Sequence, residues 1–349
     1  MSIHRPQRNW GCRIHEVTWY GIPTVVLENE LVRVSFLAGK GTDLVEFNYK
    51  PLDLDFAWLT PTGIRNPRDL VSTNPDKVAT FLDTYPGGWQ EVFPNAGAPA
   101  DSAGASYGQH GEVFCLPWDV AILEDTAERI AVRFKVRGVK SPCLIEKTVS
   151  LESRLPGIRI EETVTNPAPV ALDVMWGHHI TFGPPFLVPG ATITTPDGLT
   201  AIPHDDLVAP DERRVATADP FAWPIGTAPD GSEIDFSILP EPGTPGDLFY
   251  LTGFRDGIGS YTVTRPDAGP GMTVAWDAET LPYLWYWQQF GRIDGYPWYG
   301  RAWNVGLEPS SSYPTNGLPD AVANGSALRL GPGESRSLWL TATIDGETA

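Results

Sequence analysis

The sequence predicts an all-β protein of antiparallel strands, and three observations support this prediction. The 349 residues include 35 Gly and 34 Pro, which interrupt helices but suit short strands joined by many turns. They also include 13 Trp, 11 Tyr and 14 Phe, so the many chain reversals come with a large amount of bulky aromatic surface. Several segments alternate apolar and polar residues with a period of two, which is typical of half-buried antiparallel strands.

The alternating segments place the expected strands along the chain. They are residues 31–36, 130–136, 145–151, 158–164, 271–276, 281–288, 327–330 and 337–343. The turn Arg154-Leu-Pro-Gly157 predicts a hairpin, with Pro fixing φ and Gly accepting a positive φ. Residues 74–82 predict one short helix, and the Pro-rich region 194–245 predicts strands with long surface loops. No repeat or linker divides the chain, so we expect one domain over residues 1–349.

Charge and cysteine content limit the possible partners. The formal net charge is −18, which argues against a nucleic-acid binder because such proteins need a surplus of cations. Three cysteines are too few and too scattered for a disulfide framework. No signal-like or membrane-length apolar segment occurs. We therefore expect a cytoplasmic monomer or homodimer without a membrane or nucleic-acid partner.

Two histidines and one glutamate are the candidates for chemistry. His110 precedes an apolar segment, and His179 lies in the apolar segment that follows Trp176. Glu308 ends an apolar strand that begins near Trp303. Each has a structural alternative, a buried histidine bonded to backbone or a carboxylate that forms a turn. A carboxylate and histidines in one cleft would suit general acid–base catalysis on a neutral polyhydroxy ligand.

Two segments could pack against such a ligand. Alternation over residues 281–289 places Tyr283, Trp285 and Trp287 on one face, where indole rings would pack on the C–H face of a sugar, or would simply be core. The segment 87–95 could form the rim of a sugar site or a structural loop. Its candidate ligand-binding side chains are Trp89, Gln90, Glu91 and Asn95.

Taken in order, these motifs resemble the aldose 1-epimerase (galactose mutarotase-like) superfamily. The stretch Val32 to Leu59 also resembles the opening strands of that family, so the resemblance spans nearly the whole chain. It rests mainly on four short motifs, and only the ordered set is specific. They are Gly87-Gly-Trp-Gln-Glu91 with Phe93-Pro-Asn95, Gly108-Gln-His-Gly111, His179-Ile-Thr-Phe-Gly183 and Gly306-Leu-Glu-Pro-Ser310. They are closer to less characterised bacterial branches of the superfamily.

The resemblance implies a large β-supersandwich with a concave sugar site and no metal or organic cofactor. It implies that Glu308 is the base that takes the anomeric hydroxyl proton, and that His179 is the acid that protonates the ring oxygen. His110 would hydrogen-bond the sugar. Ring opening, rotation about the C1–C2 bond and reclosure would then interconvert the anomers.

The chain also departs from the family pattern. The substrate-binding arginine of the family is matched best by Arg65, with Arg68 close behind. Its sugar-binding acid is matched by Glu279 or Asp277. His178 is an alternative to His179, although the spacing to Phe182 favours His179. These departures affect the identity of the substrate more than the type of reaction.

Two other functions fit parts of the sequence. A non-catalytic carbohydrate-binding protein would keep the aromatic cleft. A metal-dependent isomerase on a cupin-like barrel would use His110, Glu112, His179 and Glu308 as ligands, but the sequence lacks the His-x-His pair with a nearby carboxylate that would support it. No basic cluster marks a site for an anionic sugar, although scattered arginines could converge in space.

Overall fold

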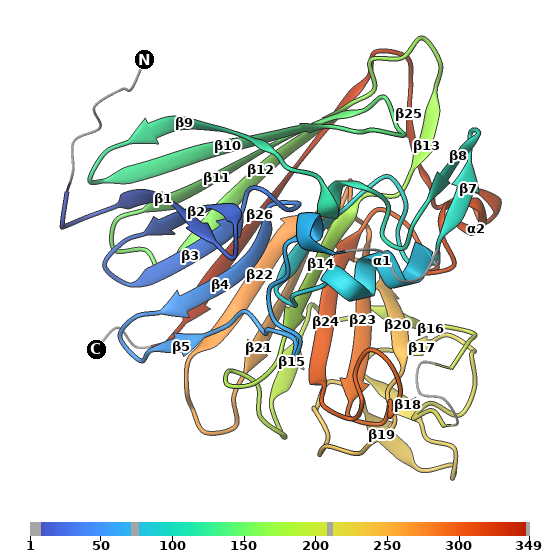
Figure 1. Ribbon diagram of the computed structural model, residues 1–349. Coiled ribbons are helices and arrows are strands. Elements are labelled where there is room, and N and C mark those ends of the chain that lie inside the picture. The colour runs from blue at the N-terminus through green and yellow to red at the C-terminus, as the bar shows by residue number, and fades with distance from the viewer. Residues whose placement is uncertain (1–7, 71–76, 208–211, 347–349) are drawn as a thin grey trace.

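The computed structural model describes residues 8–70, 77–207 and 212–346, and it contains two large antiparallel sheets (Figure 1). The first sheet has twelve strands. Eleven follow the order β1 (Arg13–Trp19), β2 (Ile22–Glu28), β3 (Val32–Leu37), β4 (Asp43–Tyr49), β6 (Trp89–Val92), β14 (Gly177–Phe182), β24 (Trp303–Ser310), β23 (Tyr283–Phe290), β20 (Leu248–Thr252), β16 (Thr200–Pro203) and β17 (Phe221–Ala222). The short β5 (Leu54–Asp55) pairs with β4.

The second sheet has eight strands. Their order is β15 (Thr192–Thr194), β21 (Ile258–Thr264), β22 (Gly271–Asp277), β26 (Ser335–Asp345), β12 (Gly157–Thr165), β11 (Leu144–Glu152), β10 (Arg129–Arg137) and β9 (Asp119–Asp125). Buried and less buried residues alternate along β12, β21 and β26. This sheet therefore buries one face and leaves the other toward solvent.

The central strands of the large sheet are buried on both faces. Every residue of β6 and β14 is buried, as are all but the first of β24. One face packs on the eight-stranded sheet through one large apolar cluster that draws residues from both sheets. The opposite face is covered by α1 (Lys77–Thr84) and by loops, as Figure 1 shows. That second covered face provides the room for a functional site.

Shorter elements complete the architecture. Three two-stranded sheets pair β7 (Ala100–Ser102) with β8 (Ala105–Tyr107), β13 (Leu172–Val174) with β25 (Leu328–Leu330), and β18 (Ile225–Thr227) with β19 (Glu233–Asp235). The remaining helices are α2 (Leu318–Ala323) and the 3₁₀ turns Pro67–Asp69 and Val113–Cys115. None of the helices in the described part of the chain combines the length and apolar character that crossing a membrane requires.

The all-β prediction is confirmed, and each predicted strand corresponds to one in the structure with ends shifted by a few residues. The predicted helix 74–82 corresponds to α1, which ends at Thr84; residues 74–76 lie outside the described part. The region 194–245 does hold short strands joined by long loops. One domain over residues 1–349 stays a prediction.

The predicted hairpin joins β11 to β12, but the role expected of its glycine was wrong. The positive φ in this turn belongs to Arg154, at 64°, whereas Gly157 already starts β12. A Cβ at Gly157 would lie 2.5 Å from the carbonyl oxygen of Ala342 on β26. Glycine is needed here because the neighbouring strand approaches closely.

Candidate functional site

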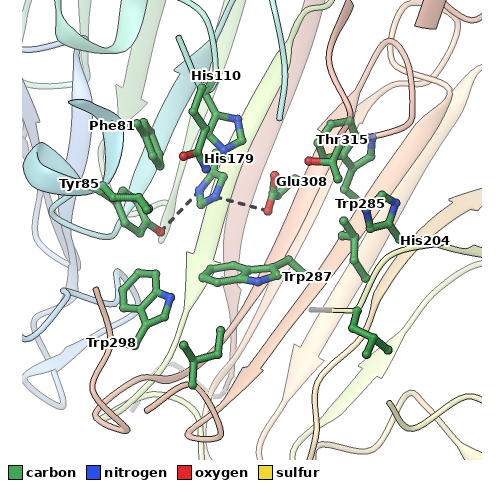
Figure 2. Close-up of a pocket in the computed structure, with 15 residues that line it drawn as sticks. Phe81, Tyr85, His110, His179, His204, Trp285, Trp287, Trp298, Glu308 and Thr315 are labelled. Atoms are coloured by element: carbon green, nitrogen blue, oxygen red, sulfur yellow. Dashed lines mark hydrogen bonds and ion pairs between the residues drawn. The ribbon is translucent and has the colours of Figure 1, made fainter. Parts of the chain in front are cut away.

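A cavity of about 310 Å³ lies on the covered face of the twelve-stranded sheet (Figure 2). Its polar lining groups include His179 on β14, Glu308 on β24 and His110 from the loop after β8. The three residues are far apart in sequence, and the sheet order brings two of them together because β14 and β24 are neighbours. The structure thus places the three principal sequence candidates in one pocket.

Glu308 and His179 form the polar centre of the cavity. Glu308 Oε1 lies 3.5 Å from His179 Nε2, and both side chains are more than nine-tenths buried. Glu308 lies opposite Trp285 in the pairing of β23 with β24. The register of β14 against β24 is set by the pairing of Thr181 with Gly306. Alternation along β14 directs His179 into the cavity and His178 toward the other sheet.

A chain of hydrogen bonds fixes the tautomer of His179. The Thr181 hydroxyl donates to the carbonyl of Gly88 at 2.7 Å, and the Tyr85 hydroxyl donates to Thr181 Oγ1 at 3.2 Å. The Tyr85 oxygen, 3.5 Å from His179 Nδ1, can then only accept a hydrogen bond from the N–H of that nitrogen. His179 Nδ1 therefore keeps its hydrogen, and Nε2, which faces Glu308, is the atom that gains or loses a proton.

His110 is held by a similar argument in the opposite tautomer. The backbone N–H of Gly97 donates to His110 Nδ1 at 3.3 Å, so the neutral ring carries its hydrogen on Nε2. The ring packs against His179 with centroids 5.1 Å apart and against Phe81 with centroids 4.6 Å apart. Burial and the neighbouring His179 hold the pKa of His110 well below its usual value, so it is a neutral hydrogen-bond donor.

Burial moves the pKa values of the central pair in opposite directions. It raises the pKa of Glu308 well above its ordinary value of 4.5. It lowers the pKa of His179 to about 4. Burial therefore favours the form of the pair in which Glu308 is protonated and His179 is neutral. The electrostatic attraction between the two groups, 3.5 Å apart, favours the form in which His179 is an imidazolium and Glu308 a carboxylate. Both forms carry one transferable proton.

Aromatic side chains form much of the remaining wall. Trp285 and Trp287, both predicted from the stripe on β23, line the cavity, as do Trp298, Tyr85 and Phe81. The ring of Trp287 lies 5.9 Å from both His179 and Trp298, measured between centroids. Alternate residues of the same strand, Leu284 and Tyr286, belong to the core between the sheets. This combination of aromatic faces and a few polar groups is typical of a small-molecule pocket.

Four candidates from the segment 87–95 do not reach this cavity. Trp89 packs in the core against Phe47 and Phe182. Gln90 is buried and donates to the carbonyl of Gly87. Asn95 donates to the carbonyls of Ala98 and Gly108 and accepts from the backbone N–H of Leu318, so it fastens loops together. These side chains therefore lie in the fold and not at the rim of the cavity, which corresponds to the structural alternative for this segment.

Glu91 and His178 belong to a buried charge cluster between the sheets. Glu91 pairs with His178 across β6 and β14, and Lys147 pairs with Glu162 across β11 and β12. Lys147 Nζ lies 3.3 Å from Glu91 Oε2, and His178 Nε2 lies 3.3 Å from Glu162 Oε2. Burial tends to lower the pKa of His178, but the two carboxylates outweigh it and raise that pKa.

The proposed arginine and acid also lie outside the cavity. Arg65 is exposed and donates to the carbonyl of Asp83 at 3.4 Å, and Arg68 is exposed as well. Glu279 and Asp277 line a shallow groove on the solvent face of the eight-stranded sheet. The sequence could not exclude these positions, because charged residues near turns look alike whichever side of a sheet they occupy.

Potential metal ligands gather only in the buried cluster, within the described residues. Glu91, Glu162 and His178 place ligand atoms within 4.8 Å of one another, but the Lys147 ammonium already supplies a positive charge there. The set His110, Glu112, His179 and Glu308 does not converge as metal ligands. Glu112 instead accepts hydrogen bonds from the backbone of Val139, Lys140 and Ser141.

Several lining residues were not predicted. Among them are His204, Gln109, Thr315, Trp298, Phe81 and Tyr85. Phe81 lies on the short helix α1 and Tyr85 directly follows it. The sequence predicted this helix but gave it no function. Gln109 is adjacent to His110 and could have been found from that motif. His204 and Trp298 lie in loop regions, where no period or motif distinguishes them.

Comparisons with known proteins agree with the fold described above. The model of a family described as a domain of unknown function (DUF4432) matches residues 20–221 and 230–344. No curated protein matches the chain. Among solved structures, a provisionally assigned aldose 1-epimerase from Klebsiella pneumoniae has a TM-score of 0.74 at 16% identity, covering 96% of this chain and 82% of its own.

Two further structures lead to the same fold. A galactose mutarotase-like protein from Clostridium acetobutylicum has a TM-score of 0.64 at 16% identity, covering 97% of this chain and 99% of its own. A galactose mutarotase related enzyme from Lactobacillus acidophilus has a TM-score of 0.60 at 16% identity, covering 92% and 97%. The predicted galactose mutarotase-like sandwich is therefore confirmed as a fold.

Proposed function

The chain belongs to the family of the domain of unknown function DUF4432, and we propose that it is a sugar mutarotase that needs no cofactor. The observation that carries the proposal is the His179–Glu308 pair, which holds one transferable proton inside an aromatic pocket. Solved structures with a similar fold are named as an aldose 1-epimerase and as a galactose mutarotase related enzyme, and these names support the same reaction class.

In the proposed reaction, one group takes the proton from the anomeric hydroxyl while the other gives a proton to the ring oxygen. The C1–O5 bond breaks, C1 becomes a carbonyl, and the chain turns about the C1–C2 bond. Closure on the other face of the carbonyl returns both protons and yields the other anomer. No atom is gained or lost, so the reaction requires only the two proton carriers.

We propose that Glu308 is the base and His179 the acid when the ring opens. This needs the imidazolium–carboxylate form of the pair, in which His179 Nε2 carries the proton that is delivered. The Tyr85–Thr181 chain supports this role, because it leaves His179 Nε2 as the only nitrogen free to exchange. His110 Nε2–H would donate to a sugar oxygen and hold the ring in place.

The test is anomer exchange over a panel of aldoses, followed by NMR or polarimetry. We expect Glu308→Gln to lower kcat by about 10²- to 10⁴-fold on any sugar that the parent protein turns over. Glu279→Gln is the matched control, since Glu279 is exposed and outside the cavity; it should exchange anomers at the parent rate. Parent-like exchange by Glu308→Gln would show that Glu308 is not the base.

A sugar-binding protein without turnover is the alternative that the same pocket allows. It would bind sugars, quench the fluorescence of the three lining tryptophans, and leave the spontaneous rate of mutarotation unchanged. That outcome would replace the enzyme proposal.

A further inference from the structure

His204 is a lining residue of the cavity to which the proposed reaction gives no role. It directly follows β16, and its backbone N–H donates to the carbonyl of Leu248 on β20 at 2.8 Å. The residue is 8% exposed. Figure 2 shows it on the far side of Glu308 from His179 and Tyr85, with Trp287 lying between the two sides.

Two hydrogen bonds determine which nitrogen of His204 carries a proton. The backbone N–H of Thr315 donates to the Tyr250 hydroxyl at 2.9 Å, so that oxygen acts as an acceptor there. The phenol hydrogen has His204 Nδ1, 3.1 Å away, as its one hydrogen-bond acceptor among the described residues, so we assign the phenol as the donor to that nitrogen. Since Nδ1 accepts, a neutral imidazole must carry its hydrogen on Nε2. Burial lowers the pKa of His204, which supports the neutral form.

The Nε2–H of His204 has no hydrogen-bond acceptor among the described residues. The Asp206 Oδ2 atom is 4.0 Å from His204 Nε2, which is beyond hydrogen-bond distance. The Asp206 side chain is 85% exposed and so belongs to the surrounding solvent. The Nε2–H therefore has its hydrogen-bond partner in the cavity, either water or a polar group of a ligand that displaces the water.

The chemistry of the cavity limits what that partner can be. Besides His204, its described lining includes six polar side chains and no Lys or Arg; the six are Tyr85, Gln109, His110, His179, Glu308 and Thr315. A phosphate or carboxylate would enter without a counter-charge and beside Glu308. The volume of about 310 Å³ lies at the small end of the range for ligand pockets. An uncharged ligand of a single ring fits these limits.

We propose that His204 determines specificity by donating its Nε2–H to a hydroxyl of an uncharged one-ring sugar, on the part of the ring remote from the His179–Glu308 pair. The proposal rests on the proposed function only in taking a sugar as the ligand. It defines a second polar subsite, built from His204, Tyr250 and Thr315, across the cavity from the proton-transfer pair.

The test combines variants with sugars that each lack one hydroxyl, and it measures binding by tryptophan fluorescence alongside kcat and KM. For the parent protein, one deoxy position should weaken binding by about tenfold, which corresponds to about 1.4 kcal/mol. His204→Phe keeps an aromatic ring and removes both nitrogens. It should weaken binding of the full sugar by about tenfold, bind that one deoxy sugar as the parent does, and raise KM by a larger factor than it lowers kcat.

Two further variants complete the design. Tyr250→Phe removes the hydroxyl that fixes the tautomer of His204, and Tyr250 does not line the cavity. It should weaken binding of the full sugar several-fold and leave binding of the same deoxy sugar unchanged. It also serves if His204→Phe does not fold. Asp206→Asn is the control for a simple surface charge effect and should bind like the parent. Equal losses for every deoxy sugar, or no loss in either ring variant, would overturn the proposal.

The two proposals can fail separately. Binding that follows the expected deoxy pattern without anomer exchange would support the His204 subsite and refute the mutarotase. Anomer exchange by the parent protein, with sugar binding unchanged in the His204 variant, would support the mutarotase and refute the His204 subsite. Tighter binding of a sugar phosphate than of the parent sugar would overturn the uncharged class.

Discussion

His179 shows how the environment of one nitrogen decides what the other can do. The Tyr85–Thr181–Gly88 chain uses Nδ1 as a donor, so proton transfer is confined to Nε2 and its neighbour Glu308. His204 and His110 follow the opposite rule, because their Nδ1 atoms accept hydrogen bonds and their Nε2–H groups are left for a ligand. Three histidines in one pocket thus have two different chemical roles.

The pH dependence of exchange should report the proton shared by this pair. We expect a bell-shaped profile of kcat/KM. As the pH falls through about 4, the pKa to which burial lowers His179, a second proton enters the pair and the base is lost. As the pH rises through the pKa of Glu308, which burial raises well above 4.5, the pair loses its only proton and the acid is lost.

The measurement is exchange by NMR at a series of pH values, corrected for the spontaneous reaction. The two limits belong to the coupled pair and not to either residue alone. A rate that rises steadily with pH, without an alkaline limb, would contradict one-proton catalysis by His179 and Glu308.

At the scale of elements, the central strands hold the site because their two faces serve different purposes. On β14, His178 faces the other sheet and His179 faces the cavity. On β23, Leu284 and Tyr286 face the core, whereas Trp285 and Trp287 face the cavity. A shift of one residue in register would exchange these sets, so the pairing of β14, β24 and β23 fixes the site.

Gly306 on β24 provides the space that Glu308 occupies. A Cβ at this position would lie 2.3 Å from Glu308 Oε1 and 3.3 Å from Trp287 Cβ. We therefore expect Gly306→Ala to displace the carboxylate and lower kcat by about 10- to 100-fold, since small misplacements of catalytic groups are costly. Because the contacted atom ends a flexible side chain, the fold should survive.

Exchange kinetics and a thermal melt of the variant check this prediction. Gly295→Ala is the matched control, since a Cβ there meets nothing within 4 Å, and it should behave as the parent in both measurements. Undiminished exchange by Gly306→Ala would mean that the carboxylate position does not limit catalysis.

At the scale of the whole molecule, a charge cluster joins the two sheets behind the site. The Glu91–His178 pair on one sheet faces the Lys147–Glu162 pair on the other, and all four side chains are buried. The indole N–H of Trp176 donates to Glu91 Oε1 at 2.8 Å. Burial and the neighbouring Glu162 raise the pKa of Glu91 to about 7. When both carboxylates are ionised, the Lys147 ammonium and a protonated His178 make the cluster neutral, which is what burial of charge requires.

Lys147→Met should lower the free energy of unfolding by about 3–5 kcal/mol, because it leaves a buried carboxylate without its cation. The control is Lys135→Met, on the neighbouring strand β10, where a partly exposed ammonium pairs with Glu146; it should cost at most about 1 kcal/mol. Chemical denaturation at pH 8 measures both, because burial and the neighbouring Glu162 raise the pKa of Glu91 to about 7 and the carboxylate is ionised above that pH. Equal effects of the two variants would show that the cluster does not stabilise the fold.

The cluster also predicts a sign for the pH dependence of stability. The pKa of His178 is raised above 6.5 in the folded protein, because the two carboxylates outweigh the effect of its burial. Its contribution to stability is therefore present below pH 6.5 and is lost as the pH rises through the folded pKa. His178→Gln should abolish this part of the pH dependence in the same denaturation series.

The sequence alone determined the fold class, the positions of eight strands and the three residues at the centre of the pocket. Alternation, turns and the order of the His110, His179 and Glu308 motifs are local properties, so they can be read along the chain. Alternation also separated Trp285 and Trp287 from their neighbours on β23, although it could not tell which face was core.

Only the tertiary structure decided which charged and polar residues reach the cavity. Arg65, Glu279, Glu91 and Asn95 have suitable side chains, but their positions depend on which sheet face or loop they occupy. His204 shows the converse, because its role depends on Tyr250 and Thr315, which come from distant strands and loops. Such contacts are long-range, and no local pattern in the sequence records them.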